Sequence, residues 1–338
     1  MRTLLLALAA ALISMGAQAA TCPLPQYPTV NCTGVPAGTA LTASGSMTIT
    51  TAGTVVDAKK VTGYIDVRAD NVVIKRSEVS LYITNRGKNL LIEDSTVGSS
   101  NAPNTCNNAG ASGGVGIGEH DFTMRRVYLR GWSDGVRISG SNVTVEDSLI
   151  VVCSNNPADH GDGVQAYGAQ NGRNIHLRHN VWDQRPAMVA GGYTAPIWLP
   201  NDRLDQLNSG AEWTEIKDNI LAGGTMSFRM PGDPANSIPW TAKEVSGNKI
   251  VNKTWYYEAT EIGKCNHILA WNNNAIVTYD FANGVVLSEV SKLTNCPESG
   301  TPTPTPEPTP VTHITLDVTV HSPGPIVIDS VTSHAVSP

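Results

Sequence analysis

Residues 145–150 read Val145-Glu146-Asp147-Ser148-Leu149-Ile150, and this six-residue pattern recurs along the chain. An apolar residue is followed by two polar residues, a Ser or Asn, any residue and a second apolar residue. Further copies begin at Ile74, Ile92, Leu177, Ile216, Val245 and Trp271, and a degenerate copy begins at Met124. Ser77 and Ser95 are 18 residues apart, and Asn180 and Asn219 are 39 apart. Short intervals are typical of one solenoid turn, and long intervals of a turn that carries a loop.

Each copy predicts a strand, a polar bend and a second strand. In a solenoid, successive coils stack their strands about 4.8 Å apart with side chains in register. An Asn or Ser at the bend then hydrogen-bonds its equivalents in the coils above and below, and this ladder satisfies backbone and side-chain groups together. The alternative is an antiparallel sandwich with strands of similar length, which does not need the bend residue to repeat.

With these repeats, about residues 45–280 resemble the right-handed parallel β-helix family that includes pectate lyases and polygalacturonases. The resemblance implies an all-β fold, a right-handed parallel β-helix solenoid of about eight to nine coils. It also implies a carbohydrate-active protein, because the named relatives cleave polysaccharides.

Motifs of the two relatives give different expectations about the reaction. Polygalacturonase-like hydrolases carry Asn-Thr-Asp, Asp-Asp, Gly-His-Gly and Arg-Ile-Lys on successive coils. Ser133-Asp134-Gly135 and His160-Gly161-Asp162 are loosely similar to the first two motifs, but no match to the last two follows. This departure argues against hydrolysis by their mechanism. The segment from Asp162 to Met188 resembles a pectate-lyase coil, although the later Arg-rich segment of those lyases has no clear match.

The rest of the chain indicates where the protein acts and how it is divided. The net charge of -6 argues against a nucleic-acid partner. Residues 1–19 have the charge, apolar run and small-residue cleavage site of a signal peptide, which predicts a secreted (extracellular or periplasmic) protein without a membrane span. We assign residues 20–299 to the β-helix domain, 300–310 to a Pro/Thr linker, and 311–338 to a short β-rich tail or module fragment. We expect a monomer.

The cysteine content fits an oxidising compartment. All 6 cysteines follow the signal peptide, and an even number favours disulfides over zinc. Proximity along the chain predicts the pairs Cys22–Cys32, Cys106–Cys153 and Cys265–Cys296.

A column of outward-facing residues is the first candidate for a binding surface. Strands upstream of the bends have apolar inward residues, and the residues between them point outward. These outward residues are Arg137, Gln165, Trp198 and Arg229. They are predicted to span three coil intervals, roughly 14 Å, about the length of three sugar units. Arg pairs with carboxylates and Trp stacks on pyranose rings, so the column suits an anionic sugar chain; the alternative is an ordinary solvated strand face.

Two of these strands begin alike, with Asp134-Gly135 and Asp162-Gly163. If the strands stack, Asp134 and Asp162 lie one coil apart, with about 5 to 6 Å between their carboxyls. They are then close enough to perturb each other or to share a metal such as Ca²⁺, and His160 adds an imidazole. The alternative is that each Asp turns the chain and accepts backbone N–H bonds.

Other histidines give weaker indications of a site. His176 and His179 belong to the repeat strand away from the column, and we expect them at the surface or beside the ladder. The triplet Glu119-His120-Asp121 fits a chemical site and a turn equally well.

Three functional hypotheses follow. The leading one is a lyase that cleaves an acidic, uronate-containing polysaccharide by β-elimination. Asp134 and Asp162, with Ca²⁺ or nearby Arg, neutralise the uronate carboxylate, and Arg137, His160 or Arg229 takes the C5 proton. The second is a glycoside hydrolase that uses the Asp pair as acid and base or nucleophile. The third is a non-catalytic binding or adhesin solenoid, in which Gln165, Trp198 and the Arg residues bind polysaccharide without turnover.

Overall fold

The computed structural model describes residues 20–98, 114–154, 158–166, 172–199, 212–230 and 241–297. This described part is nearly all β, with one short helix, α1 (Arg185–Ala190), and one 3₁₀ turn, η1 (Cys265–His267). It belongs to a compact unit that ends at Thr303. The predicted signal peptide, Pro/Thr linker and C-terminal tail lie outside the described residues.

One sheet of the described chain contains nine strands, and every neighbouring pair in it is parallel. We call it the β13 sheet. Its strands, in spatial order, are β2 (Val55–Asp57), β4 (Val73–Lys75), β7 (Leu90–Glu93), β10 (Phe122–Arg125), β13 (Val143–Glu146), β16 (Ile175–Arg178), β19 (Glu212–Lys217), β22 (Thr241–Ser246) and β25 (Trp271–Asn272).

The second sheet has 18 strands within the described ranges, and they follow two series that share β3. The β12 series consists of β1 (Thr42–Ile49), β3 (Lys59–Val67), β6 (Ile83–Asn85), β9 (Val115–Glu119), β12 (Asp134–Ile138), β15 (Asp162–Ala166), β18 (Ala195–Trp198), β21 (Met226–Met230) and β24 (Glu258–Ile262). The β14 series continues from β3 through β5 (Glu78–Val79), β8 (Thr96–Val97), β11 (Tyr128–Arg130), β14 (Leu149–Val151), β17 (Val181–Asp183), β20 (Ile220–Ala222), β23 (Lys249–Val251), β26 (Asn274–Asp280) and β27 (Val285–Leu293).

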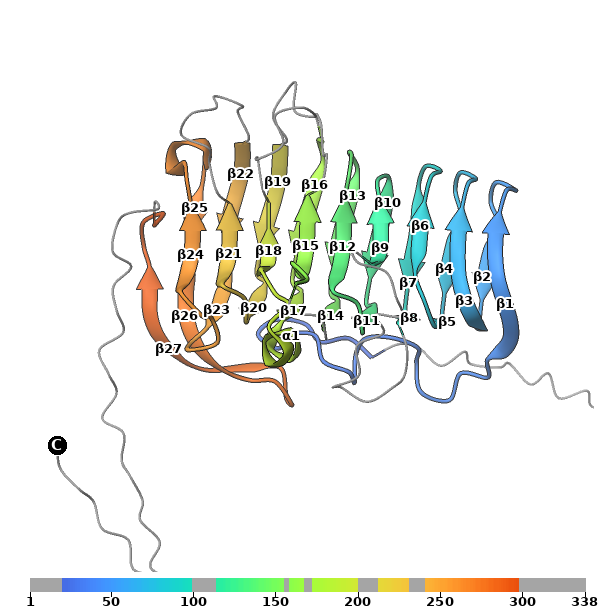
Figure 1. The fold of residues 1–338 in the computed structure, drawn as a ribbon, viewed down its shortest axis with the longest axis horizontal. Coiled ribbons are helices and arrows are strands. Elements are labelled where there is room, and N and C mark those ends of the chain that lie inside the picture. Colours follow the sequence, from blue (N-terminus) through green and yellow to red (C-terminus); the bar gives the residue numbers. More distant parts are fainter. Residues whose placement is uncertain are drawn as a thin grey trace, which may run out of the picture. The chain divides into compact units, whose positions relative to one another are not determined.

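The chain visits these strands in a fixed order. A strand of the β13 sheet is followed by one of the β14 series and one of the β12 series, and the chain then returns to the β13 sheet one position further along (Figure 1). The β26–β27 pair is antiparallel, whereas the other named strand pairs of the described chain are parallel. This arrangement is consistent with a β-solenoid and excludes the antiparallel sandwich.

The bend ladder predicted from the repeats is confirmed. The Oδ1 atom of Asn180 accepts a hydrogen bond from the backbone N–H of Ser148 at 3.0 Å, and that of Asn219 accepts one from Asn180 at 3.1 Å. Asn248 and Asn274 continue the ladder with N···O distances of 3.2 and 3.0 Å. These four Asn side chains are buried. Because each amide bonds the next coil, the ladder fixes the relative position of neighbouring coils.

The residue that precedes each ladder position bends the chain. It has a positive φ in all copies, the degenerate one included. These residues are Arg76, Asp94, Arg126, Asp147, His179, Asp218, Gly247 and Asn273. A left-handed residue turns the strand sharply without lengthening the coil. The six-residue pattern therefore encodes a corner between the β13 sheet and the β14 series.

The core lies inside the coils and is built mainly from aliphatic side chains. Val136 and Ile138 of β12 and Val143 and Val145 of β13 are fully buried in it. The few large aromatic side chains, such as Trp182, fill single positions. Alternation in β10, β13 and β16 leaves every second side chain partly exposed, as the pattern predicts, whereas β17 and β20 are buried throughout.

An N-terminal segment, residues 20–40, runs across the outside of the coils, and we call it the N-terminal strap (Figure 1). The backbone N–H of Tyr27 donates to the carbonyl of Gly284 at 2.7 Å, and that of Gly34 donates to the carbonyl of Arg126 at 2.9 Å. The strap therefore joins the β26–β27 hairpin to a coil near the middle of the chain.

One disulfide lies in the N-terminal strap, and another lies near the C-terminal end of the described chain. The predicted Cys22–Cys32 and Cys265–Cys296 pairs are confirmed. Cys153 is disulfide-bonded, but its predicted partner Cys106 lies outside the described residues, so that pairing stays a prediction. None of the helices in the described ranges has the length and apolar character needed to span a bilayer.

Candidate functional site

Strand pairing places the four residues of the predicted column opposite one another. Arg137 faces Gln165, Gln165 faces Trp198, and Trp198 faces Arg229 along the β12 series. Glu261 of β24 follows in the same register. The column side chains are partly exposed, whereas the residue before each of them on its strand is buried. We call these four residues the Arg137–Arg229 column.

Both guanidinium groups of the column are held by carboxylates. The Nη2 atom of Arg137 lies 3.2 Å from Oδ2 of Asp134, and Arg229 pairs with Glu261. The guanidinium of Arg229 also lies 5.3 Å from the centre of the Trp198 ring. The two Arg side chains remain 24% and 26% exposed, so a ligand on the outside can reach them.

Asp134 and Asp162 begin successive strands, but their carboxyls face the backbone and not the surface. They are 6% and 0% exposed. Asp134 accepts a hydrogen bond from the N–H of Asp162 at 3.3 Å, and Asp162 accepts one from the N–H of Ala195 at 3.1 Å. The backbone-bonding role that the turn alternative predicts is therefore present. The Oδ2 atom of Asp162 is buried without a hydrogen-bond partner among the described residues.

Burial controls the protonation of this pair. It raises the pKa of Asp134 to about 6, and the charge and hydrogen bonds of Arg137 and Asp162 oppose the rise. The pKa of Asp162 is also raised by burial and, further, by the neighbouring carboxylate of Asp134. A carboxyl with an unbonded, buried oxygen is more stable in its neutral form. Both carboxyls beside Arg137 therefore keep their protons to a higher pH than an exposed aspartate does.

The residues around the pair do not fit Ca²⁺. Calcium takes 6 to 8 oxygen ligands. One oxygen of each carboxyl already accepts a backbone N–H, and the second oxygen of Asp134 faces the cationic Arg137. The described ranges contain no group of three or more His, Cys, Asp or Glu placed to hold a metal. We derive no step through a metal here.

His160 precedes β15 by two residues, and its side chain is exposed. The structure thus brings Arg137, Gln165, Trp198 and Arg229 together and places the Asp pair beneath Arg137, while the role of His160 stays a prediction.

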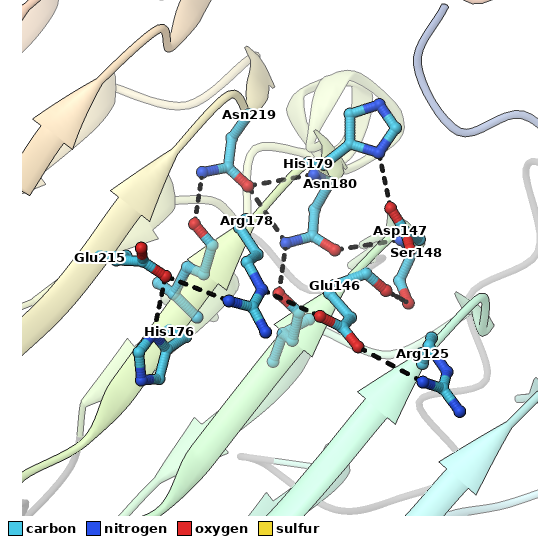
Figure 2. A network of polar contacts seen from close by, with 12 residues as sticks. Arg125, Glu146, Asp147, Ser148, His176, Arg178, His179, Asn180, Glu215 and Asn219 are labelled. Carbon is cyan, nitrogen blue, oxygen red and sulfur yellow. Dashed lines mark hydrogen bonds and ion pairs between the residues drawn. The ribbon is translucent and has the colours of Figure 1, made fainter. Parts of the chain in front are cut away.

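Sequence reasoning missed a ladder of ion pairs on the outer face of the β13 sheet (Figure 2). Arg125 pairs with Glu93 at 2.7 Å, and Arg178 pairs with Glu146 at 2.9 Å and with Glu215 at 3.2 Å. The signal was present in the repeats. Two residues before the ladder position, the charge alternates in sign along Lys75, Glu93, Arg125, Glu146 and Arg178.

The minor histidines take the places expected of them. His179 contacts Asp147 at 2.6 Å and His176 contacts Glu215 at 2.7 Å, so both lie beside the ladders. His120 lies in a turn, and it also contacts a carboxylate. Its Nδ1 atom lies 2.8 Å from Asp121, and Asp121 has the positive φ of a turn.

No protein-family model, curated protein or solved structure matches this chain.

Proposed function

We propose that the protein is a secreted, right-handed parallel β-helix of about eight to nine coils that binds an acidic, uronate-containing polysaccharide and cleaves it by β-elimination. The observation that supports this proposal is the register of the Arg137–Arg229 column. Two guanidinium groups flank an amide and an indole on four successive strands. Their spacing of roughly 14 Å matches about three sugar units across stacked strands.

Each column residue has a role in the proposed reaction. Arg137 and Arg229 pair with uronate carboxylates, Trp198 stacks on a pyranose, and Gln165 hydrogen-bonds hydroxyl groups. Neutralising the carboxylate acidifies the C5 proton, which a base removes. The C4–O bond breaks as the C4–C5 double bond forms, and the leaving oxygen takes a proton from water. The proposed acceptor is Arg137, His160 or Arg229.

The Asp pair acts through Arg137 in this proposal. Asp134 lies 3.2 Å from the guanidinium and positions it, and Asp162 fixes the backbone beneath. Both are positioning residues, because the fully buried carboxyl of Asp162 has no surface for a substrate to touch. The same burial gives no support to a hydrolase, which needs two carboxyls facing the bond that is cleaved.

A non-catalytic binding or adhesin solenoid is the second candidate. The observation in its favour is that both column guanidinium groups already have carboxylate partners. A guanidinium in an ion pair binds an anion well but is a poor proton acceptor, because it already carries its full set of protons. The column then provides affinity for an acidic polymer without turnover.

The test is incubation of the purified protein with polygalacturonate, alginate and a neutral glucan, with and without Ca²⁺. Ultraviolet absorbance follows unsaturated products, and a separate assay follows reducing ends. An increase in both on an acidic polymer supports the lyase, and loss of both with a chelator adds a metal to it. Reducing ends alone indicate a hydrolase, and binding without either signal indicates the second candidate.

Two variants relate the result to the column. Trp198→Ala removes the stacking ring and is expected to weaken binding of the acidic polymer about tenfold. Asp134→Asn removes the charge that positions Arg137 and is expected to reduce turnover. Full activity in Asp134→Asn would remove the Asp pair from the proposal.

A further inference from the structure

Two of the acidic corner residues each pair with a cationic corner residue of the next coil. Asp94 pairs with Arg126 at 2.7 Å. Asp147 follows with His179 at 2.6 Å. The repeat thus has a rule in which each acidic corner residue receives a cationic group from the coil that follows it.

The rule stops at Asp218. The next corner residue is Gly247, and a Cβ atom there would lie 2.0 Å from Oδ1 of Asp218. On the other side, both ring nitrogens of His179 are used, by Asp147 and by the carbonyl of Gln26. Asp218 therefore has no side-chain hydrogen bond or ion pair in the part of the chain that the structure describes, and its Oδ1 atom occupies the space beside Gly247 where a corner side chain would begin.

A hollow lies at this place. It has a volume of about 480 Å³ and is lined by Tyr27, Lys217, Asp218, Glu244, Gly247 and Lys249, among others. The cations in its wall are occupied, because Lys217 pairs with Glu244 at 3.2 Å and Lys249 donates to the carbonyl of Asn273 at 2.9 Å.

The surroundings of Asp218 make its charged carboxylate less stable than it would be in water. Burial raises the pKa of Asp218, and the charges of Lys217, His179 and Lys249 only partly oppose the rise. A half-buried carboxylate without a direct partner gains most from a ligand that brings a positive charge and hydrogen-bond donors.

We propose that the hollow at Asp218 and Gly247 binds an alkylguanidinium or alkylammonium group, which takes the place of the cation that the repeat lacks there. The group enters the hollow beside Asp218 and donates to the carboxylate. This site is separate from the Arg137–Arg229 column and does not depend on the proposed polysaccharide reaction.

The probe is n-butylguanidinium, and n-butylurea is its uncharged counterpart of the same shape. Binding to the full protein is followed by NMR shifts of the Gly247 amide and the Tyr27 ring. We expect butylguanidinium to bind at least tenfold more tightly than butylurea. Acetyl-arginine amide, tested in parallel, distinguishes a side chain carried by a peptide from a free small cation. Equal affinities for n-butylguanidinium and n-butylurea would overturn the proposal.

Three variants locate the binding. Asp218→Asn is expected to reduce the affinity for butylguanidinium about tenfold. Lys249→Gln removes a competing charge and is expected to increase it about two- to threefold. Asp280→Asn, which changes a carboxylate on the β26–β27 hairpin, is the control and should not change it. Unchanged affinity in Asp218→Asn, with the fold intact by circular dichroism, would contradict the assignment.

Discussion

The hydrogen-bond partners of many single residues in this protein come from neighbouring coils. Both nitrogens of His179 face acceptors, the Asp147 carboxylate at 2.6 Å and the Gln26 carbonyl at 2.9 Å. Only the doubly protonated imidazolium can donate to both. His179 is thus a positive charge between a strand corner and the N-terminal strap.

The first prediction concerns the pH dependence of this contact. Burial lowers the pKa of His179, but the hydrogen bonds to Asp147 and Gln26 and the Asp147 charge outweigh it, so the pKa in the fold is raised. The stability that it contributes is therefore complete below the ordinary pKa of about 6.5 and is lost as the pH rises through the folded value. Urea unfolding of wild type and His179→Gln should show this pH-dependent loss in wild type only. If the free energies of unfolding of wild type and His179→Gln changed equally with pH, this prediction would be wrong.

The second prediction concerns Asp162. Burial raises its pKa, so its contribution to stability is complete below pH of about 3.9 and decreases as the pH rises. Asp162→Asn keeps an oxygen for the Ala195 N–H and removes the buried charge. Relative to wild type, the variant should gain free energy of unfolding as the pH rises from 4 to 8. Denaturant titrations at both pH values measure this, and a constant difference would show that Asp162 does not titrate.

The sequence could predict where side chains point but not what they contact. Alternation along strands was enough to align Arg137, Gln165, Trp198 and Arg229, because the period of a strand is two. The burial of Asp162 could not be predicted, since it depends on Ala195 in the next coil, 33 residues further on.

At the scale of elements, the buried amide ladder is the main determinant of the corner. Asn219 accepts bonds from the backbone and side chain of Asn180 and from the Trp182 indole, and it donates to Leu177 and Asn248. Each bond is made without water, because the side chain is fully buried.

The third prediction tests this ladder. Asn219→Ala leaves several buried donors and acceptors without partners, and we expect a loss of about 3–5 kcal/mol in free energy of unfolding. The exposed Asn266 provides the control, since Asn266→Ala should change stability by less than about 0.5 kcal/mol. Chemical denaturation of both variants measures the difference. A loss below about 1 kcal/mol would mean that backbone bonds alone hold the corner.

The fold was predictable at this scale because the corner recurs. The copies that begin at Ile74 and Val145 are enough to place a strand, a left-handed residue and a buried Ser or Asn. The N-terminal strap could not be predicted in the same way, since residues 20–40 contain no copy of the pattern and contact Gly284 and Arg126, which are distant in sequence.

At the scale of the whole described unit, stability is expected to be distributed along the stack, because each coil contacts mainly its neighbours. The C-terminal end is finished differently from the middle. There the antiparallel β26–β27 pair follows the parallel strands, and the Cys265–Cys296 disulfide closes a segment with a sequence separation of 31 residues.

The fourth prediction concerns this end. Replacing Cys265 and Cys296 by Ala removes a cross-link worth about 3–4 kcal/mol for a loop of this length. Hydrogen exchange should accelerate first in β24 to β27, while β7 and β10 keep their protection, because the coils are coupled only to near neighbours. Uniform acceleration throughout the stack would show instead that the unit unfolds as one cooperative body.

The N-terminal strap also limits how this protein can change in evolution. Solenoids commonly gain or lose repeats by duplication or deletion of one coil. Here the strap bonds Gly284 through Tyr27 and Arg126 through Gly34, and the Cys22–Cys32 bond constrains its own path. A coil duplicated between these two points would displace one of them by about 4.8 Å. The number of coils between Arg126 and Gly284 is therefore fixed unless the strap changes in the same event.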